Sequence, residues 1–316
     1  MFKRILVPLD GSGQAERVLP IAARLARASG GSVILVRVIS TDPAHLPTAP
    51  AKPMLDQTFG GADQTQAESY LRAVAGSELL SGISVQIHVP VGAVPASILA
   101  IAANEHADII VMSSHGETGV RRWWLLGSVA AKVARFAEVP VFVLREGGPL
   151  PKERHPGERP LRVLVPLDGS DEAKAALEPA AYLAATLAAP GQGALHLVYV
   201  VKPARKPQYT QADQNVVREY LEAMVRRLRD GSENPAIAKL NLEITSSVII
   251  DDDIDRGITR AAENGGKSEG NGIFEGSDVI AMTTHGSNGL QPWVGSVIER
   301  VLYTTRLPLL IVRPRK

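Results

Sequence analysis

The chain carries the same signature twice. The hexapeptide VPLDGS at residues 7–12 returns without a change at residues 165–170. A second pair of matching segments lies near the end of each copy, where Ser-His-Gly or Thr-His-Gly is followed by Gly-Ser at residues 114–128 and 284–296. Two landmarks repeated in the same order predict one structural unit built twice. Any fold proposed for one half must therefore suit the other half as well.

Length and composition agree with two domains. The chain has 316 residues, which is more than one hydrophobic core usually serves. A proline-bearing and charged stretch separates the two copies, so we expect a first domain at residues 1–146, a linker at 147–159 and a second domain at 160–316. Aromatic residues make up only 4% of the chain, so the cores must consist mainly of aliphatic side chains.

Each copy alternates short apolar runs with segments of helical periodicity. In the first copy the apolar runs fall at residues 5–7, 32–39, 85–89, 109–112 and 141–144. Strand, helix and strand in alternation predict an α/β fold in which each domain is a doubly wound, Rossmann-like, five-stranded parallel sheet with helices on both faces. The second copy departs in two places, a glycine-rich stretch at 265–276, expected to be a flexible insertion, and the triplet Asp251–Asp253.

Charge and residue usage exclude several classes of function. The formal net charge is +1 and is shared evenly between the halves, which argues against a nucleic-acid partner. The chain contains no cysteine, so it has no disulfide, thiol nucleophile or cysteine metal site. No apolar run approaches the roughly 18 residues that a membrane span needs. We therefore expect a cytoplasmic protein that does not enter a membrane.

The repeated glycine segments indicate a phosphate site. Ligands of doubly wound sheets bind at the carboxyl ends of the strands, and there each copy places an Asp-Gly-Ser turn and a glycine-bearing loop. The Gly-Ser pair at 127–128 precedes a predicted helix, whose first amides are unpaired and carry partial positive charge. Neither copy places the Gly-x-Ser-x-Gly of hydrolases after a predicted strand, and neither contains the Walker phosphate loop.

With these landmarks, each half resembles the universal stress protein family, and the whole chain resembles a tandem member of it. The resemblance rests on VPLDGS after the first strand, Val91-Gly92, the Ser-His-Gly or Thr-His-Gly loop, Gly-Ser before the last helix, and Val-Pro-Val or Leu-Pro-Leu opening the last strand. It implies an adenine nucleotide, ATP with or without Mg²⁺, as the ligand.

The resemblance also assigns residues to the adenine, the ribose and the phosphates. In the first copy they are Asp10, Val38, Gly92, Ser113, His115, Gly116, Gly119, Gly127, Ser128 and Val129. In the second copy they are Asp168, Val200, Thr283, Gly286, Gly289, Gly295, Ser296 and Val297.

The chain departs from the family's nucleotide-binding pattern. Ser113 and Thr283 replace the first glycine of the phosphate loop, although their hydroxyls can donate to phosphate. The spacer between the later glycines has ten residues in the first copy and eight in the second, against about nine in the family. Because Asp252 stands where the first copy has Gly92, we expect repulsion of a triphosphate and a weaker second site.

Structural roles for the same residues stay open. Asp10 and Asp168 also suit turns, Ser128 and Ser296 also suit helix caps, and His115 also suits a buried structural position. Three functions follow: an ATP-binding stress protein that regulates without efficient turnover, an interaction protein without nucleotide, and a slow ATP hydrolase. The apolar last strands, 139–145 and 307–313, are expected to pair as an intramolecular pseudo-dimer, with a further homodimer left open.

Overall fold

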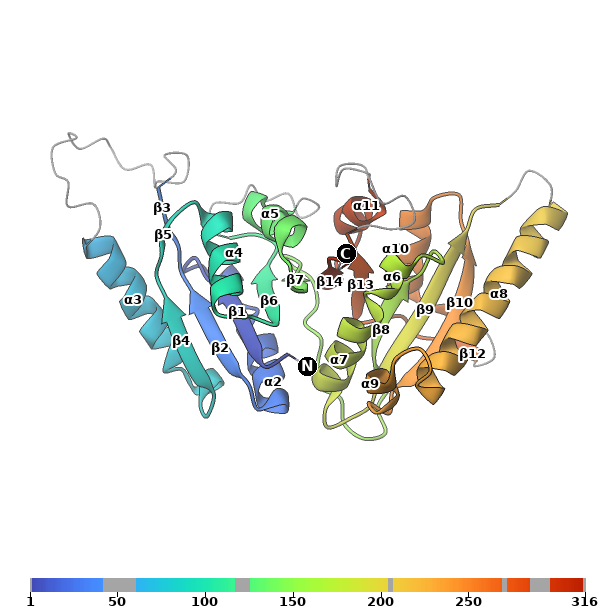
Figure 1. The fold of residues 1–316 in the computed structure, drawn as a ribbon, viewed down its shortest axis with the longest axis horizontal. Helices are drawn as coiled ribbons and strands as arrows, with labels where there is room; N and C mark the ends of the chain where they lie inside the picture. Colours follow the sequence, from blue (N-terminus) through green and yellow to red (C-terminus); the bar gives the residue numbers. More distant parts are fainter. Residues whose placement is uncertain are drawn as a thin grey trace.

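A single mixed sheet runs through the whole molecule (Figure 1). The computed structural model describes residues 2–41, 61–116, 126–203, 207–268, 272–284 and 296–314. The sheet has ten strands in the order β10-β9-β8-β13-β14-β7-β6-β1-β2-β4. In chain order these strands are β1 (Arg4–Pro8), β2 (Ser32–Val36), β4 (Ser84–His88), β6 (Ile109–Ser113), β7 (Val141–Leu144), β8 (Leu161–Pro166), β9 (Gly193–Val201), β10 (Glu243–Ile250), β13 (Val279–Thr283) and β14 (Leu309–Val312).

Helices follow the strands in the same sequence in each half. The first half holds α1 (Gly13–Glu16), α2 (Leu19–Ser29), α3 (Gly61–Ala75), the 3₁₀ turn η2 (Glu78–Leu80), α4 (Val94–Asn104) and α5 (Ser128–Phe136). The second half holds α6 (Asp171–Lys174), α7 (Leu177–Ala188), α8 (Pro207–Asp230), α9 (Pro235–Ala238), α10 (Ile254–Asn264) and α11 (Val297–Thr304). No helix in the described parts of the chain combines the length and apolarity needed to cross a membrane.

Five parallel strands form the main sheet of each half, as the alternation of elements predicts. The orders β4-β2-β1-β6-β7 and β10-β9-β8-β13-β14 match strand for strand, and every pairing among the five strands of each half is parallel. The doubly wound fold class is therefore confirmed for both copies.

The insertion in the second half contains regular structure. It was expected to be flexible, yet β11 (Gly266–Ser268) and β12 (Gly272–Phe274) pair antiparallel there. The first half has a different small ladder, in which β3 (Ile39–Ser40) and β5 (Val91–Gly92) run parallel beyond the main sheet. The β3–β5 ladder brings the chain just after β2 close to the start of α4.

The repeated Asp-Gly-Ser turn folds the same way twice. Oδ1 of Asp10 accepts the backbone N–H of Ser12 at 3.0 Å, and Ser12 in turn caps α1 by accepting from Ala15. Asp168 and Ser170 repeat both contacts. The intervening glycines have φ of +94° and +86°, a left-handed region that favours glycine. The predicted turn role of both aspartates is thus confirmed.

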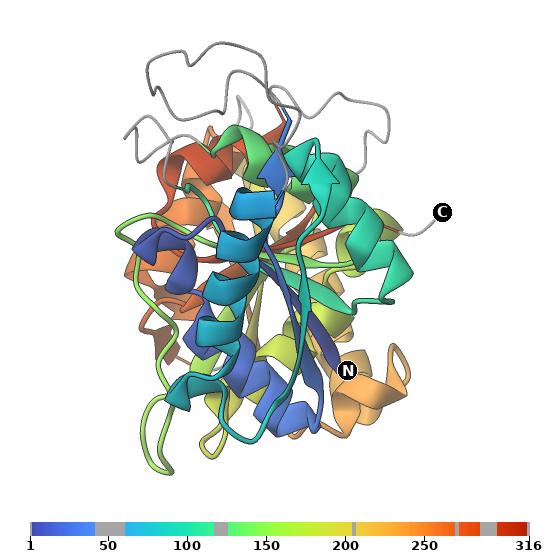
Figure 2. The same ribbon diagram turned by 90° about the vertical axis from the view of Figure 1, so that its left-hand side faces the viewer.

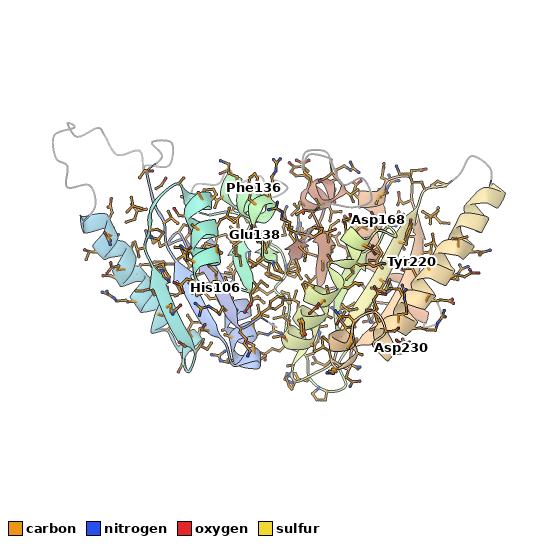
Figure 3. All side chains as sticks on the ribbon, in the orientation of Figure 1. His106, Phe136, Glu138, Asp168, Tyr220 and Asp230 are labelled. Atoms are coloured by element: carbon orange, nitrogen blue, oxygen red, sulfur yellow. The ribbon has the colours of Figure 1, made fainter. Side chains whose placement is uncertain are left out.

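Helices lie on both faces of the sheet (Figure 2), and the buried side chains between the helices and the sheet form apolar clusters. Figure 3 draws the side chains on the same ribbon. On one face the core lies under α2, α3, α7, α8 and α9, and on the other under α4, α5, α10 and α11. Each core cluster contains residues of both halves, so the hydrophobic interior is continuous across the junction. Burial of aliphatic residues on both faces is typical of parallel sheets.

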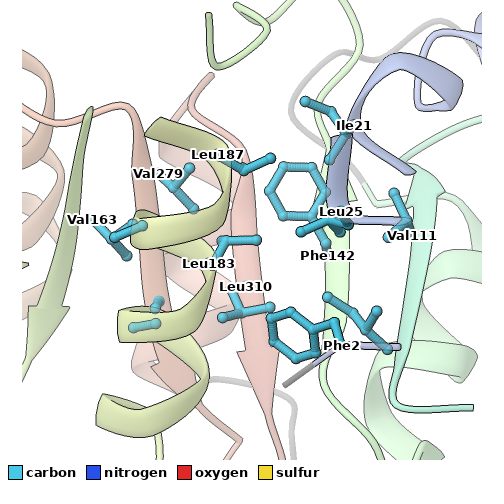
Figure 4. Packing of buried hydrophobic residues seen from close by; sticks show 14 of the residues in the cluster. Phe2, Ile21, Leu25, Val111, Phe142, Val163, Leu183, Leu187, Val279 and Leu310 are labelled. Atoms are coloured by element: carbon cyan, nitrogen blue, oxygen red, sulfur yellow. The ribbon is translucent and has the colours of Figure 1, made fainter. Parts of the chain in front are cut away.

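The two halves join through their last strands. β7 and β14 pair antiparallel, with Phe142 opposite Leu310, which confirms the predicted pairing of these segments. Both side chains are fully buried, and they lie between α2 and α7, which contact each other across the junction (Figure 4). Each strand would otherwise expose an apolar edge, a common route to aggregation.

Phe142 provides a test of this junction. Replacing it by alanine is expected to lower the free energy of unfolding by about 3–5 kcal/mol, because a large aromatic side chain leaves a fully packed core. Phe136 is the matched control, since it is 53% exposed at the end of α5, and Phe136→Ala is expected to change stability by less than about 0.5 kcal/mol. Urea unfolding of both variants measures the difference, and equal effects would contradict a packed junction.

His196 in β9 makes stability depend on pH. It is fully buried, and its ring nitrogens lie 2.8 Å from the hydroxyls of Thr245 and Ser247. Burial lowers the pKa of His196 to about 3. Below the unfolded-state pKa of about 6.5 the unfolded chain therefore binds a proton that the folded chain does not, so stability falls as pH drops from about 6.5 towards 3, by up to roughly 1.4 kcal/mol per pH unit.

His196→Gln is expected to flatten that part of the profile. The variant removes the titrating group but keeps hydrogen-bonding capacity, whereas His155→Gln, at an exposed position, is expected to leave the slope unchanged. Urea unfolding at several pH values measures both slopes. A wild-type slope retained in His196→Gln would show that His196 does not carry the effect.

Candidate functional site

A cavity of about 290 Å³ opens at the carboxyl ends of β1, β2 and β6, where a doubly wound sheet places its ligands. This volume is at the lower end of the roughly 300–1,000 Å³ of small-molecule sites. The cavity is lined by Pro8, Leu9, Asp10, Ala15, Val36, Arg37, Val38, Ser40, Val94, Ile98, Met112, Ser113, Ser114, His115, Gly116, Gly127, Ser128, Val129 and Ala130. Eight of the first-copy candidates from the sequence belong to this lining together: Asp10, Val38, Ser113, His115, Gly116, Gly127, Ser128 and Val129.

Asp10 and Gly116 approach each other at the centre of the cavity wall. A Cβ atom added to Gly116 would collide with Oδ2 of Asp10, so only glycine fits there without moving the carboxylate. Oδ1 of the same carboxylate is held by Ser12. The carboxylate is thus fixed between the first turn and the loop that follows β6, facing the cavity.

The loop after β6 is held by its own side chains. The hydroxyl of Ser113 donates to the carbonyl oxygen of His115, so in the described structure this donor is engaged within the loop itself. The hydroxyl of Ser114 lies 3.0 Å from Nδ1 of His115 and accepts the backbone N–H of Glu146. The replacement of the usual glycine by Ser113 therefore adds a local hydrogen bond that shapes the loop.

His115 lines the cavity but is largely enclosed by protein. Its side chain is 5% exposed, and Nδ1 lies 3.5 Å from the Glu146 carboxylate. Burial lowers the pKa of His115 and the Glu146 carboxylate opposes that shift. The imidazole is accordingly neutral near pH 7, and its role in the described structure is to connect the loop with the chain after β7.

Gly127 and Ser128 form the entrance to α5. The N–H of Gly127 donates to the Ser114 carbonyl at 2.8 Å, and a Cβ at Gly127 would lie 2.7 Å from that oxygen. The close packing requires glycine at this position. The Gly127 amide is engaged with the Ser114 carbonyl and so has a partner within the protein. Gly127 is itself the N-cap of α5 and no side chain among the described residues caps the helix, so Ser128 does not act as the cap that was considered from the sequence.

The first turn of α5 consequently points at the cavity with its amides uncapped. Ser128, Val129 and Ala130 begin the helix, and all three line the cavity. The first amides of a helix have no intrahelical acceptor and carry about half a positive charge in total. This is the most favourable place for an anion in the described lining.

An apolar patch occupies the other side of the cavity. Val38, Ile98 and Met112 line it, and they belong to the core cluster under α4 and α5. A flat aromatic ring fits such a surface. Gly92 does not line the cavity; it pairs with Ser40, which does.

Arg37 is the residue that the sequence reasoning missed. It lines the cavity directly after β2, next to Val38. The available signal was a single charged residue interrupting the apolar run at 33–39. Its counterpart in the second half, by alignment of β2 with β9 on their pairings with β1 and β8, is Tyr199.

The second half starts its last helix differently. Ser296 is the N-cap of α11, and its hydroxyl accepts the backbone N–H of Glu299 at 3.3 Å, which confirms the predicted helix cap. One amide of that helix is thus satisfied by the protein, while none is capped by a side chain in α5. Asp168, Val200, Thr283 and Val297 are described in this half, whereas Gly286, Gly289 and Gly295 lie outside the described residues, as does Gly119 in the first half.

Two of the three acidic residues at 251–253 pair with arginines. Asp251 is 2% exposed at its side chain, and it lies 2.7 Å from Arg256 and 3.2 Å from Arg260. Hydrogen bonding from Arg256 lowers the pKa of Asp251, and Asp253 also pairs with Arg256. The negative charge of these two residues is therefore partly offset, whereas Asp252, which stands where the first half has Gly92, is exposed.

Within the described residues, no group of three carboxylate or histidine side chains is arranged to hold a metal ion. Asp10 is the only carboxylate among the described residues of the cavity lining. The protein side chains thus provide no Mg²⁺ site of their own in this part of the molecule.

Comparison with known proteins identifies the family. The sequence model of the universal stress protein family matches residues 1–145 and again residues 161–313. A universal stress protein of Thermus aquaticus is 31% identical over 145 residues, covering 46% of this chain and all of that protein. A universal stress protein of Methanocaldococcus jannaschii is 26% identical over 147 residues, covering 46% of this chain and 84% of that protein.

Solved structures of double length share the whole fold. The crystal structure of a universal stress protein from Archaeoglobus fulgidus superimposes with a TM-score of 0.61 at 21% identity, covering 98% of this chain and 96% of that one. A putative universal stress protein from Pseudomonas aeruginosa gives a TM-score of 0.60 at 17% identity, covering 99% and 94%. The chain belongs to the universal stress protein family and carries two of its domains in tandem.

Proposed function

We propose that the protein binds an adenine nucleotide, ATP in the first instance, in the cavity of its first half and regulates a stress response through the bound state. The observation that carries the proposal is the uncapped first turn of α5 facing a cavity that also holds a fixed carboxylate and an apolar wall. In this arrangement the α5 amides receive the phosphates, Asp10 accepts from the ribose hydroxyls, and the patch around Val38 receives the adenine.

A regulatory role is supported by the connection of the loop to the linker. Ser114 and His115 contact Glu146, directly after β7. Two residues on, the Gly148 carbonyl accepts from Arg17 at 2.9 Å, and a Cβ at Gly148 would collide with the Arg306 carbonyl of the second half. A ligand that alters the loop thus acts on a segment packed tightly between both halves.

Mg²⁺ enters the proposal only as a counterion carried by ATP. When bound, it would neutralise phosphate charge, with water and phosphate oxygens as most of its ligands. The protein's own contribution is the helix amides and the positioning of the nucleotide.

A second candidate function, an interaction protein without nucleotide, is favoured by a specific observation. Two donors that the family resemblance would assign to phosphate are already used, the Ser113 hydroxyl and the Gly127 amide. A loop closed by its own hydrogen bonds is also what a purely structural role would need.

Thermal unfolding separates the two candidates. With ATP at about 100 times its dissociation constant, the binding domain gains roughly 2.7 kcal/mol, and its midpoint rises by several degrees, at about 2–4 °C per kcal/mol. Parallel runs with ADP, AMP and Mg²⁺ alone separate nucleotide from metal effects. A flat response to all three nucleotides would support the interaction protein, and steady phosphate release abolished by Asp10→Ala would instead indicate a hydrolase.

The role of the α5 amides can be tested by removing a single amide hydrogen, that of Ser128. Ser128→Pro removes a single amide hydrogen at the first helical position, where proline is well tolerated, and the Gly127 ψ of 151° suits a residue before proline. We expect ATP to bind about tenfold more weakly, since a hydrogen bond to a charged group contributes about 1.5–3 kcal/mol.

Val297→Pro at the first position of α11 is the matched control. Its N-cap, Ser296, has a comparable ψ of 159°, so the second substitution is accommodated in the same way. We expect it to leave ATP affinity unchanged in calorimetric titration. Equal losses from both substitutions would refute a site confined to the first half.

A further inference from the structure

The cavity lining includes a cationic residue, Arg37, to which the proposed binding of an adenine nucleotide with phosphates only at its 5′ end assigns no contact. Arg37 lines the wall next to the Asp10 turn, and its guanidinium would touch a Cβ placed on Gly11, at 3.4 Å. Asp10 lies between Arg37 and α5, because its carboxylate meets Gly116 on one side and the Gly11 turn follows it on the other. The two positive elements of the site are thus separated by the residue proposed to hold the ribose.

The Arg37 side chain is held in place by an aromatic ring. Its guanidinium carbon lies 4.9 Å from the ring centroid of Tyr70 in α3. The Tyr70 hydroxyl donates to Glu16 at 2.8 Å, which fixes the ring, and the Arg37 backbone N–H donates to the His88 carbonyl. A cation stacked on an aromatic face keeps the N–H groups around its rim available.

The N–H groups of the Arg37 guanidinium donate to no group in the described structure. Arg37 is half-buried, and within the parts of the chain that are described its guanidinium makes no hydrogen bond or ion pair. The nearest carboxylates are already engaged, Asp10 by Ser12 and Glu16 by Tyr70. A fixed guanidinium with free donors matches the geometry of a phosphate group.

We propose that the ligand of the first half carries a second phosphate, on the 2′ or 3′ position of its ribose, and that Arg37 is the residue that selects it. The inference rests on the proposed nucleotide site. In the proposed arrangement the 5′ phosphates lie on α5 and the ribose at Asp10, so a phosphate on the 2′ or 3′ oxygen would be received beside the Gly11 turn, where the guanidinium lies. The carboxylates of Asp10 and Glu16 lie at the same corner, so without Arg37 an added phosphate would be repelled.

The second half lacks this device. Tyr199 stands at the position of Arg37 and packs edge-on against Tyr220, with ring centroids 6.4 Å apart. Lys174 stands at the position of Glu16, by the alignment of the two VPLDGS segments. Figure 3 labels Tyr220 and Asp168, which both lie in the second half. Selection of a ribose phosphate is thus a property of the first half.

Calorimetric titration of the full chain at fixed salt tests the proposal. AMP, ADP, adenosine 2′,5′-bisphosphate and adenosine 3′,5′-bisphosphate differ by one phosphate and its position. We expect one of the two bisphosphates to bind wild type about tenfold more tightly than AMP, the gain of one charge-assisted pair. In Arg37→Met that gain is expected to fall to about twofold or less, whereas the ratio of ADP to AMP affinity stays unchanged.

Two further variants guard against misfolding. Arg37→Tyr copies the residue that the second half holds at this position, and it is expected to lose the bisphosphate gain in the same way. Arg135→Met is the matched control, because the Arg135 guanidinium also lies over an aromatic ring, Phe136 at 5.3 Å, but outside the cavity. It is expected to keep the full gain.

The outcomes distinguish this inference from the proposed function. If AMP, ADP and ATP all fail to bind wild type, both fall together. If these nucleotides bind but neither bisphosphate gains over AMP, only the role of Arg37 is overturned. A loss in Arg37→Met that is equal for ADP and the bisphosphates would likewise overturn it, because Arg37 would then act on the 5′ phosphates or on the fold.

Discussion

Antiparallel pairing of β7 with β14 is the contact on which the rest of this molecule depends. Each half is a parallel sheet that would end in an apolar edge strand, and the pairing covers both edges at once. Phe142 and Leu310 are fully buried at that seam, and the core clusters run through it from one half into the other. The two domains therefore share an interior, and the linker after β7 is confined between them.

Because the linker is confined in this way, the candidate site lies beside a chain segment that packs against the second half. The loop after β6 is bound to Glu146 through Ser114 and His115, and Gly148 is pressed against the second half at Arg306. In a fold where ligands bind at the carboxyl ends of strands, a loop of this kind is the first part of the protein that a phosphate would meet. The contacts of this loop with Glu146 connect the cavity wall to the chain segment that packs against the second half at Gly148.

The two halves show how small differences divide the roles of a repeated fold. Both contain Gly-Ser before the last helix, yet Gly127 caps α5 by its backbone position alone and Ser296 caps α11 with its hydroxyl. Only the second half carries an acidic triplet, before α10, where the first half has Val91-Gly92-Ala93 before α4, and two of its three acids pair with Arg256 and Arg260. The two halves thus differ both in charge before these two helices and in hydrogen bonding at the start of the last helix.

The sequence by itself determined the repeat, the strands and helices, the Asp-Gly-Ser turns and the pairing of the last strands, because these follow from local propensity and from the period of apolar residues. It also identified eight of the nineteen described residues that line the cavity. Only the tertiary structure decided the hydrogen-bond partners of the loop, where the Ser113 hydroxyl donates to the His115 carbonyl and the Gly127 amide donates to the Ser114 carbonyl. It also decided that Asp251 forms ion pairs with two arginines and that Arg37 lines the cavity. Each of these depends on which side chain reaches a group distant along the chain or across a turn, and such contacts are set by packing after the elements have formed.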